Sequence, residues 1–198
     1  MNKKKKPHGV QLLLRCVVTD PDGKVISDTG NKPAKSFVIQ FLEYIYYCAI
    51  GGTQNATEVD GTEDVIYTFL GVCTGSFAID GAINEDTHGI VIGTGDTAET
   101  NTDFALDVQL TEGVGAGQIT HGAQVVGAAG VVGANVDLEI KRAFTNNTGS
   151  NITVKEAGVY VTNYDARWHC IIRDVLALSC EVPDRCSLSV IYTVRTTV

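Results

Sequence analysis

Residues 144–160 read FTNNTGSNITVKEAGVY and have the pattern of a β-hairpin. Apolar residues alternate with polar ones on both sides of a tip, residues 146–151, that is rich in Asn, Gly and Ser. Period-two spacing around such a cluster is the strongest short-range signal for two antiparallel strands joined by a turn. We therefore predict that the strand ending at Phe144 pairs with the strand beginning at Ile152.

The composition fits a single, mainly β domain. The chain has 198 residues, of which 21 are glycine, and apolar residues make up 44% and charged residues 19% of it. A chain of this length and apolar content can bury one core. A sequence rich in Gly, Thr and Val and low in charge is more typical of all-β folds than of helical ones. We predict a basic, disordered tail at residues 1–9 and one domain over residues 10–198.

Short apolar strands separated by Gly/Asn turns continue from His88 to the end of the chain. The predicted strands there cover residues 90–92, 118–126, 136–144, 152–161, 168–174 and 188–195, and earlier ones cover residues 10–19, 25–26 and 65–70. Helices do not alternate with them, so we predict an antiparallel, jelly-roll-like β-sandwich. Residues 53–64 are expected to be a loop. The small residues at 127–133 suit either a surface loop or the close approach of a neighbouring chain.

One helix is predicted, over residues 36–50 in the N-terminal half. Apolar residues recur there at helical spacing, two glycines follow, and Ser36 is placed to cap the helix. The polar side is thin, so we expect burial on more than one side, by the domain itself or by a neighbouring subunit. The candidate interface residues are Phe41, Tyr44, Tyr46, Tyr47 and, from a later strand, Trp168. Stacking against a sugar is the alternative use of these rings.

The net charge restricts the classes of partner, and the cysteine spacing restricts the possible zinc sites and disulfides. The net charge of −8 argues against nucleic acid or an anionic membrane, and Lys3–Lys6 is the one basic cluster. No apolar run approaches the roughly 20 residues of a membrane-spanning helix. The six cysteines have no zinc-site spacing. Cys180 and Cys186 flank a turn-like segment and are the best candidates for a disulfide, although a reducing cytosol would leave them as thiols.

No motif predicts a catalytic, cofactor or metal site. Residues 93–98, GTGDTA, match the glycine pattern of dinucleotide-binding loops, but no helix-forming sequence follows, and a tight turn explains the glycines better. The four histidines are scattered. His169 and Cys170 are neighbours on a predicted strand and should point to opposite faces. We predict that the chain is not an enzyme and uses no cofactor.

Three segments together resemble a diverse group of virion proteins of tailed bacteriophages. The first segment has a strand, GTGDTA at residues 93–98 and a D-x-x-L element at residues 103–106. The second runs from RAFTNNTG to ITVKEAGVY, over residues 142–160. The third has IRD at residues 172–174, a Val-Pro pair and LSVIYTV ending at Val194. Ala157 departs from the pattern, which has a larger apolar residue there.

The resemblance implies a non-enzymatic β-sandwich component of the virion, such as a capsid decoration, neck, tail or fibre protein. It implies partners among other copies of the chain and other virion proteins, with a trimer as the expected oligomer. It brings no catalytic residues to this sequence. Two alternatives stay open: a carbohydrate- or receptor-binding module that recognises a glycan, and an extracellular filament subunit.

Overall fold

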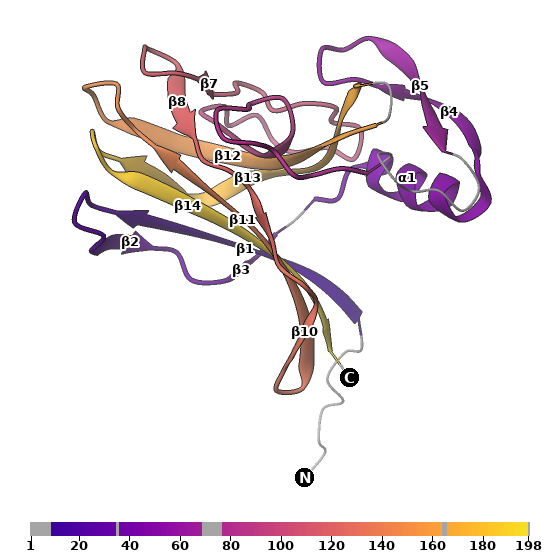
Figure 1. Ribbon diagram of the computed structural model, residues 1–198, viewed down its shortest axis with the longest axis horizontal. Helices are drawn as coiled ribbons and strands as arrows, with labels where there is room; N and C mark the ends of the chain where they lie inside the picture. Colours follow the sequence, from indigo (N-terminus) through magenta and orange to yellow (C-terminus); the bar gives the residue numbers. More distant parts are fainter. Residues whose placement is uncertain (1–8, 35, 69–76, 164–165, 198) are drawn as a thin grey trace.

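The computed structural model describes residues 9–34, 36–68, 77–163 and 166–197 and consists mainly of antiparallel sheets packed face to face (Figure 1). The large sheet contains β1 (Gly9–Thr19), β2 (Val25–Asp28), β3 (Lys32–Pro33), β7 (Thr111–Glu112), β8 (Gln118–His121), β9 (Val125–Val126), β10 (Gly130–Val132), β11 (Asn135–Thr145) and β14 (Ser187–Thr197). The small sheet has the order β13 (Trp168–Val182), β12 (Ile152–Thr162), β6 (Gly89–Gly93). The predicted mainly β, antiparallel sandwich with one helix is confirmed.

The hairpin predicted at residues 144–160 is wrong. β11 pairs with β14 in the large sheet, whereas β12 pairs with β13 and β6 in the small one. Residues 146–151 therefore carry the chain from one sheet to the other. β13 and β14 are joined by a second crossing at the same end, next to the first. Period-two alternation is the same for a turn within a sheet and for a turn between sheets, so the sequence signal did not separate them.

Asn146 connects these two crossings. Its fully buried side-chain amide donates hydrogen bonds to the carbonyl oxygens of Ser150, at 2.7 Å, and Val182, at 2.8 Å. Its Oδ1 accepts hydrogen bonds from the backbone and the hydroxyl of Thr148. Its own backbone pairs with Arg185 and Cys186. One side chain with both donors and acceptors thus fixes the end of the sandwich where the chain changes sheets.

The main core lies between the two sheets. Alternate residues of β1, from Leu12 to Val18, face it together with Phe144, Leu188 and Val190. The small sheet contributes Ile90, Val159 and Ile171, among others, from the opposite side. A second, smaller core covers the outer face of the small sheet and consists of Val38, Val91, Leu106, Tyr160 and Cys170. The small sheet is therefore buried on both faces.

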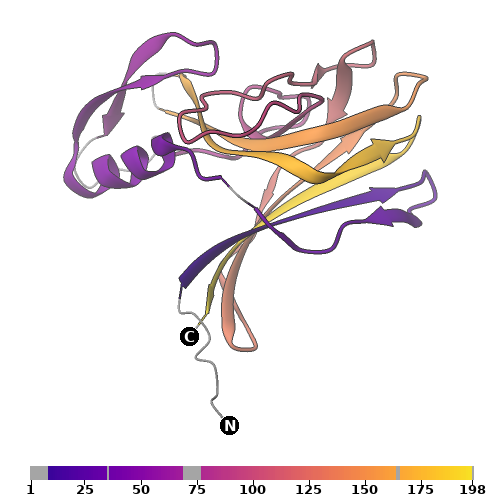
Figure 2. The same cartoon turned by 180° about the vertical axis from the view of Figure 1, so that it is seen from behind.

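The helix and a small hairpin form a lobe at one end of the sandwich (Figures 1 and 2). They are α1 (Ile39–Ile50) and the pair β4 (Gly52–Thr57) and β5 (Glu63–Thr68). The prediction of a loop at residues 53–64 is wrong. Most of that stretch belongs to this hairpin, because it contains nearly all of β4 and the start of β5. The helix begins at Ile39 rather than Ser36, which does not cap it: the Ser36 carbonyl accepts a hydrogen bond from the Arg173 amide at the sheet edge.

Several strands of the large sheet extend beyond the sandwich as an arm (Figure 1). The arm consists of the first residues of β1, the last of β14, the first of β11, and β10. Part of segment 127–133 is therefore a strand. No helix among the described residues combines the length and apolarity needed to cross a bilayer. The tail predicted at residues 1–9 lies outside the described residues except for Gly9, which begins β1.

Candidate functional site

Glu156 on β12 has a fully buried carboxylate that accepts four hydrogen bonds. Oε1 accepts hydrogen bonds from the backbone amides of Gly95, at 3.1 Å, and Val108, at 2.8 Å. Oε2 accepts hydrogen bonds from the backbone amide of Asp107, at 3.0 Å, and from Nε of Arg173, at 3.2 Å. Three backbone donors and one guanidinium compensate the buried negative charge, which would otherwise be very costly.

Arg173 on β13 shares its charge between two carboxylates. Its Nη1 donates to Asp103 at 2.7 Å, its Nη2 donates to the Thr97 carbonyl at 2.9 Å, and Nη2 lies 3.2 Å from Glu156. Burial alone would lower the pKa of Arg173, but the hydrogen bond and charge of Asp103, with the charge of Glu156, raise it. Burial likewise opposes ionisation of Asp103, and hydrogen bonds from Thr100 and Arg173 outweigh it, so its pKa is lowered.

We call Gly95, Asp103, Glu156 and Arg173 the Glu156 cluster. It brings together residues of all three segments that resemble phage proteins. A Cβ on Gly93 would lie 2.4 Å from the Val108 carbonyl and 2.5 Å from Glu156 Oε1, so glycine is needed for this close approach. The Gly95 amide, which a dinucleotide loop would offer to phosphate, is bonded to a carboxylate instead. The cluster fastens residues 94–108 over the outer face of the small sheet.

Arg142 on β11 is a second buried cation, and it donates its hydrogen bonds to backbone carbonyl groups. Its guanidinium donates to the carbonyl oxygens of Gly122 at 2.8 Å, His88 at 3.1 Å, Ile90 and Ala82 at 2.9 Å, and Glu85. Five N–H donors in a rigid fork are what distinguishes arginine from lysine. Burial lowers the pKa of Arg142, and nearby acidic residues oppose that shift. The contacts fasten the segment before β6 to the large sheet.

Tyr44 and His169 form a buried pair between α1 and β13. The Tyr44 hydroxyl lies 2.8 Å from Nδ1 of His169, and both side chains are fully buried. Burial raises the pKa of Tyr44 and lowers the pKa of His169 to about 4. The histidine is therefore neutral near pH 7. Burial also raises the pKa of the neighbouring Cys170 thiol, which is bonded to its own strand rather than to His169.

The candidate interface residues separate into three groups. Tyr44 was predicted at an interface and is instead in the core. Phe41, Tyr46 and Tyr47 lie on α1, where Phe41 and Tyr47 are half-buried, Tyr46 is exposed, and the two tyrosine rings meet edge-on at 4.9 Å. Trp168 is half-buried at the start of β13, beside the β4–β5 hairpin, where its carbonyl accepts a hydrogen bond from Val59.

The structure does not join Cys180 to Cys186. The five described cysteines carry no disulfide, and the Cys180 thiol contacts Cys16 on the opposite sheet. That contact, together with burial, raises the pKa of the Cys16 thiol. The prediction failed because the turn between β13 and β14 is a crossing between sheets, which directs Cys180 into the core between the sheets.

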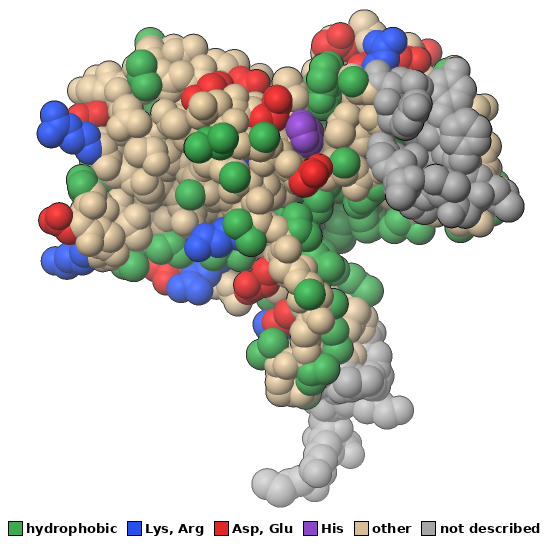
Figure 3. All heavy atoms as spheres, in the orientation of Figure 1, with side chains coloured by type: hydrophobic (Ala, Val, Ile, Leu, Met, Phe, Trp, Pro, Cys, Tyr) green, Lys and Arg blue, Asp and Glu red, His purple; other side chains and the backbone are tan. Residues whose placement is uncertain are grey.

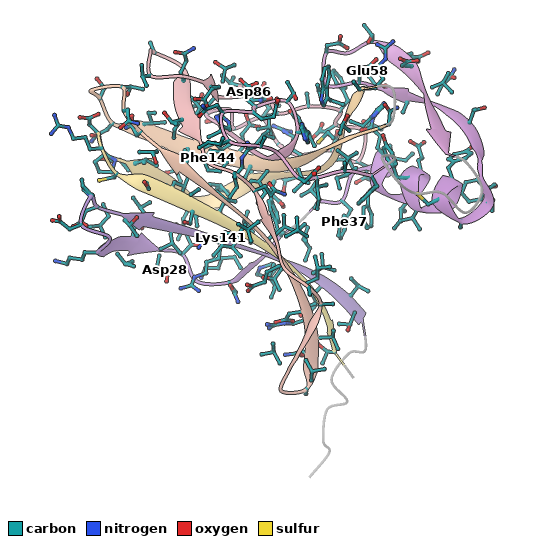
Figure 4. All side chains as sticks on the ribbon, viewed as in Figure 1. Asp28, Phe37, Glu58, Asp86, Lys141 and Phe144 are labelled. Atoms are coloured by element: carbon teal, nitrogen blue, oxygen red, sulfur yellow. The ribbon has the colours of Figure 1, made fainter. Side chains whose placement is uncertain are left out.

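An exposed apolar surface follows α1 towards the arm. Hydrophobic side chains gather on the underside of the lobe and continue on the arm (Figure 3). On the helix the exposed residues are Ile39, Leu42, Ile45, Tyr46 and Ile50. Phe37 lies between the lobe and the arm (Figure 4), and its ring stacks on Phe41 at 4.0 Å. The helix was predicted to be buried on more than one side; within one chain, one side remains open.

Sequence reasoning missed the buried roles of Glu156, Arg173 and Arg142. In sequence, Lys155-Glu156 and Arg173-Asp174 are adjacent opposite charges on predicted strands, a pattern typical of ion pairs at strand ends. Lys155 does pair with an exposed carboxylate, Asp96, at 2.8 Å, but Glu156 points inward. Residues 158–161, GVYV, were the available signal that this strand is buried on both faces. Such a strand has a continuous apolar run in place of alternating apolar and polar residues. Among the described residues, no group of three or more metal-ligating side chains is close enough to hold an ion.

No family model matches the chain, and searches of curated proteins and of solved structures find no significant match. The bases for a function are therefore the geometry of the chain itself and the resemblance of its three segments to phage virion proteins.

Proposed function

We propose that the chain is a non-enzymatic structural component of a bacteriophage virion. It would act through contacts with other copies of itself and with other virion proteins, in the capsid decoration, neck, tail or fibres. A trimer is the proposed oligomer. Large self-complementary surfaces on a stiff scaffold are what such a component requires.

One observation carries this proposal. Two buried charged residues of the second resembling segment, Arg142 and Glu156, which a catalytic site would direct at a substrate, are directed mainly at the protein's own backbone. Glu156 binds three amides, and Arg142 binds five carbonyls. These contacts support a scaffold role for the chain. The most reactive-looking sequence neighbours, His169 and Cys170, are both buried and take part in packing.

The surface supports an interaction role for the same chain. Exposed leucine, isoleucine and tyrosine side chains cluster on one side of α1, whereas scattered single apolar residues would need no explanation. Aromatic and aliphatic residues in such a cluster are typical anchors of protein–protein interfaces.

Quantitative mass spectrometry of purified particles tests the proposal. Peptides of this chain should be present at a fixed copy number relative to the major capsid protein, and gold-labelled antibodies should mark one position on the particle. A chain that is made during infection but is absent from particles of normal composition would contradict the proposal.

A glycan-binding module is the second candidate, and the exposed Tyr46 beside Tyr47 is the observation that favours it. An aromatic ring of this kind can stack on a sugar. Specific binding on a glycan array that is lost in Tyr46→Ala would support this candidate. An extracellular filament subunit would instead form regular fibres without particles, which negative-stain images would reveal.

A further inference from the structure

Cys16 on β1 and Cys180 on β13 belong to opposite sheets and meet in the main core. The thiol of Cys16 donates a hydrogen bond to the sulfur of Cys180, and both residues are buried. Facing sheets usually lie about 10 Å apart, whereas Cα atoms of β1 and β13 come within 8 Å of each other. Sulfur atoms in contact across so narrow a gap need only a small shift to bond, since disulfide partners usually have Cα atoms about 4–7 Å apart.

A bulge in β13 brings Cys180 to this place. β12 pairs with Val175 on one side of the bulge and with Cys180 on the other. Residues 176–179 between them lie opposite a single residue of β12, Lys155. A bulge bends its strand and redirects the side chains that follow it. The sulfur of Cys180 therefore points across the core towards β1.

A recess between β1 and the bulge reaches this pair of thiols. It is lined by Cys16, residues 32–34 and residues 174–178, among others. Leu178 is 64% exposed, and its carbonyl oxygen lies 4.0 Å from Sγ of Cys180, so the recess ends beside both sulfur atoms. Its volume of about 50 Å³ is enough for a water-sized molecule. A bulky alkylating reagent would still require the core to open.

We propose that Cys16 and Cys180 form a site of reversible oxidation, at which hydrogen peroxide joins the two sheets through a disulfide. The bond would fasten β1, and with it the large sheet, to β13 of the small sheet. Such a site is independent of the structural role proposed above. In a reducing cytosol both residues would remain thiols, and the bond would form where the medium is oxidising.

Cys180 is the nucleophile of the pair. The hydrogen bond from Cys16 lowers the pKa of Cys180 against the effect of burial, and the same contact, together with burial, raises the pKa of Cys16. The thiolate is the reactive form of cysteine. The Cys180 thiolate attacks one oxygen of the peroxide and the O–O bond breaks. Cys180 becomes a sulfenic acid, and the other oxygen leaves as water with the proton that Cys180 has lost.

The second step closes the bond. The sulfur of Cys16 attacks the sulfur of the Cys180 sulfenic acid, the S–O bond breaks, and the hydroxide leaves as water with the proton of Cys16. In sum, two thiols and one hydrogen peroxide give one disulfide and two water molecules. A reducing thiol reverses the bond by exchange.

Peptide mapping of the full chain tests the site. Reduced protein is treated with hydrogen peroxide, the excess is removed with catalase, and the remaining thiols are blocked with N-ethylmaleimide in urea before digestion. A peptide pair joined through Cys16 and Cys180 should appear after oxidation and be absent before it. The oxidised chain should melt about 10 °C higher than the reduced chain, because the bond closes a long loop. Reductant should abolish both changes.

Serine variants test the order of the two steps. Cys16→Ser keeps a hydrogen-bond donor beside Cys180 but cannot form the bond, so Cys180 should remain a sulfenic acid that dimedone labels. Cys180→Ser removes the nucleophile and should leave Cys16 unlabelled. Cys186→Ser is the matched control, because Cys186 is also a buried cysteine. It should form the bond between Cys16 and Cys180 like the wild type, and circular dichroism checks that each variant is folded.

A folded wild type that keeps Cys16 and Cys180 as separate thiols after peroxide treatment would overturn the proposal. A bond from Cys180 to any other cysteine, or between two chains, would overturn it as well. Labelling of Cys16 in folded Cys180→Ser would contradict the assignment of the nucleophile. If a serine variant does not fold, the mapped bond and the melting temperature of the wild type still decide whether the site exists.

Discussion

The carboxylate of Glu156 and the guanidinium of Arg173 lie 3.2 Å apart in the interior, 0% and 3% exposed. Both belong to adjacent strands of the small sheet, and together they hold residues 94–108 against its outer face. A buried pair of this kind adds little net stability compared with an apolar replacement of both partners, but removing one partner leaves an uncompensated charge. The pair therefore specifies where the covering segment lies.

Glu156→Gln should destabilise the fold by about 3–5 kcal/mol, because Arg173 stays buried with half of its charge compensation lost. Urea unfolding measures this change. Hydrogen exchange should also accelerate at the amides of Gly95, Asp107 and Val108, which donate hydrogen bonds to Glu156.

The matched control for that change is Glu139→Gln, at an exposed position of β11. Surface substitutions of this type usually stay within about 0.5 kcal/mol of the wild type. Equal effects of the two substitutions, or unchanged exchange at the three amides, would show that the cluster does not hold the segment.

Arg142→Lys should destabilise the chain by about 3 kcal/mol, because an ammonium group cannot supply five donors in one plane and leaves buried carbonyls unpaired. Loss of protection should concentrate in residues 82–90, whose carbonyls Arg142 binds. Arg185→Lys, at a highly exposed position, is the control and should be nearly neutral. A stable Arg142→Lys protein with wild-type exchange would disprove this role.

The stability of the wild type should fall as the pH drops from about 6.5 towards 4. The pKa of His169 is lowered by burial from 6.5 to about 4, so the unfolded chain binds the proton first in this window. The contribution of neutral His169 to the free energy of unfolding is fully present above the pKa that this histidine has in the unfolded chain, and it amounts to about 3 kcal/mol. His169→Gln keeps a hydrogen-bond partner for Tyr44 and should flatten this slope. Carboxylates such as Asp103 act at lower pH, because their pKa is already lowered. An unchanged slope in the variant would refute the assignment.

Cys180 and Cys186 should be alkylated as separate thiols after denaturation without reductant. In the native chain, the buried Cys16, Cys170, Cys180 and Cys186 should react about 10³-fold more slowly than in urea, because exposure requires opening of the core. Cys48, half-buried on α1, should react before them. Peptide mapping measures both quantities, and a peptide pair joined through Cys180 and Cys186 would contradict this expectation.

Local patterns predicted where the strands lie but not which strands pair. Alternation located β11, β12 and β14 closely, because a half-buried strand needs period-two spacing. The partner of β11 is β14, more than 40 positions away in sequence, and no local signal carries that choice. The helix was found for the same reason as the strands, whereas its first residues were misplaced because the sheet edge holds Ser36. For the candidate site, spacing identified the helix that carries Phe41, Tyr46 and Tyr47. It could not show that Tyr44 faces His169, which only tertiary packing decides.

The pairing of β1 with β14, from Gly9 opposite Thr197 to Thr19 opposite Ser187, has a consequence for synthesis. β1 is far ahead of β14 in the chain, so the large sheet cannot close until β14 has also been made. Closure of this sheet therefore depends on long-range pairing, which is typically slow. A chain without β14 would leave β1 and β11 each with a bare edge, which could pair with the wrong neighbour.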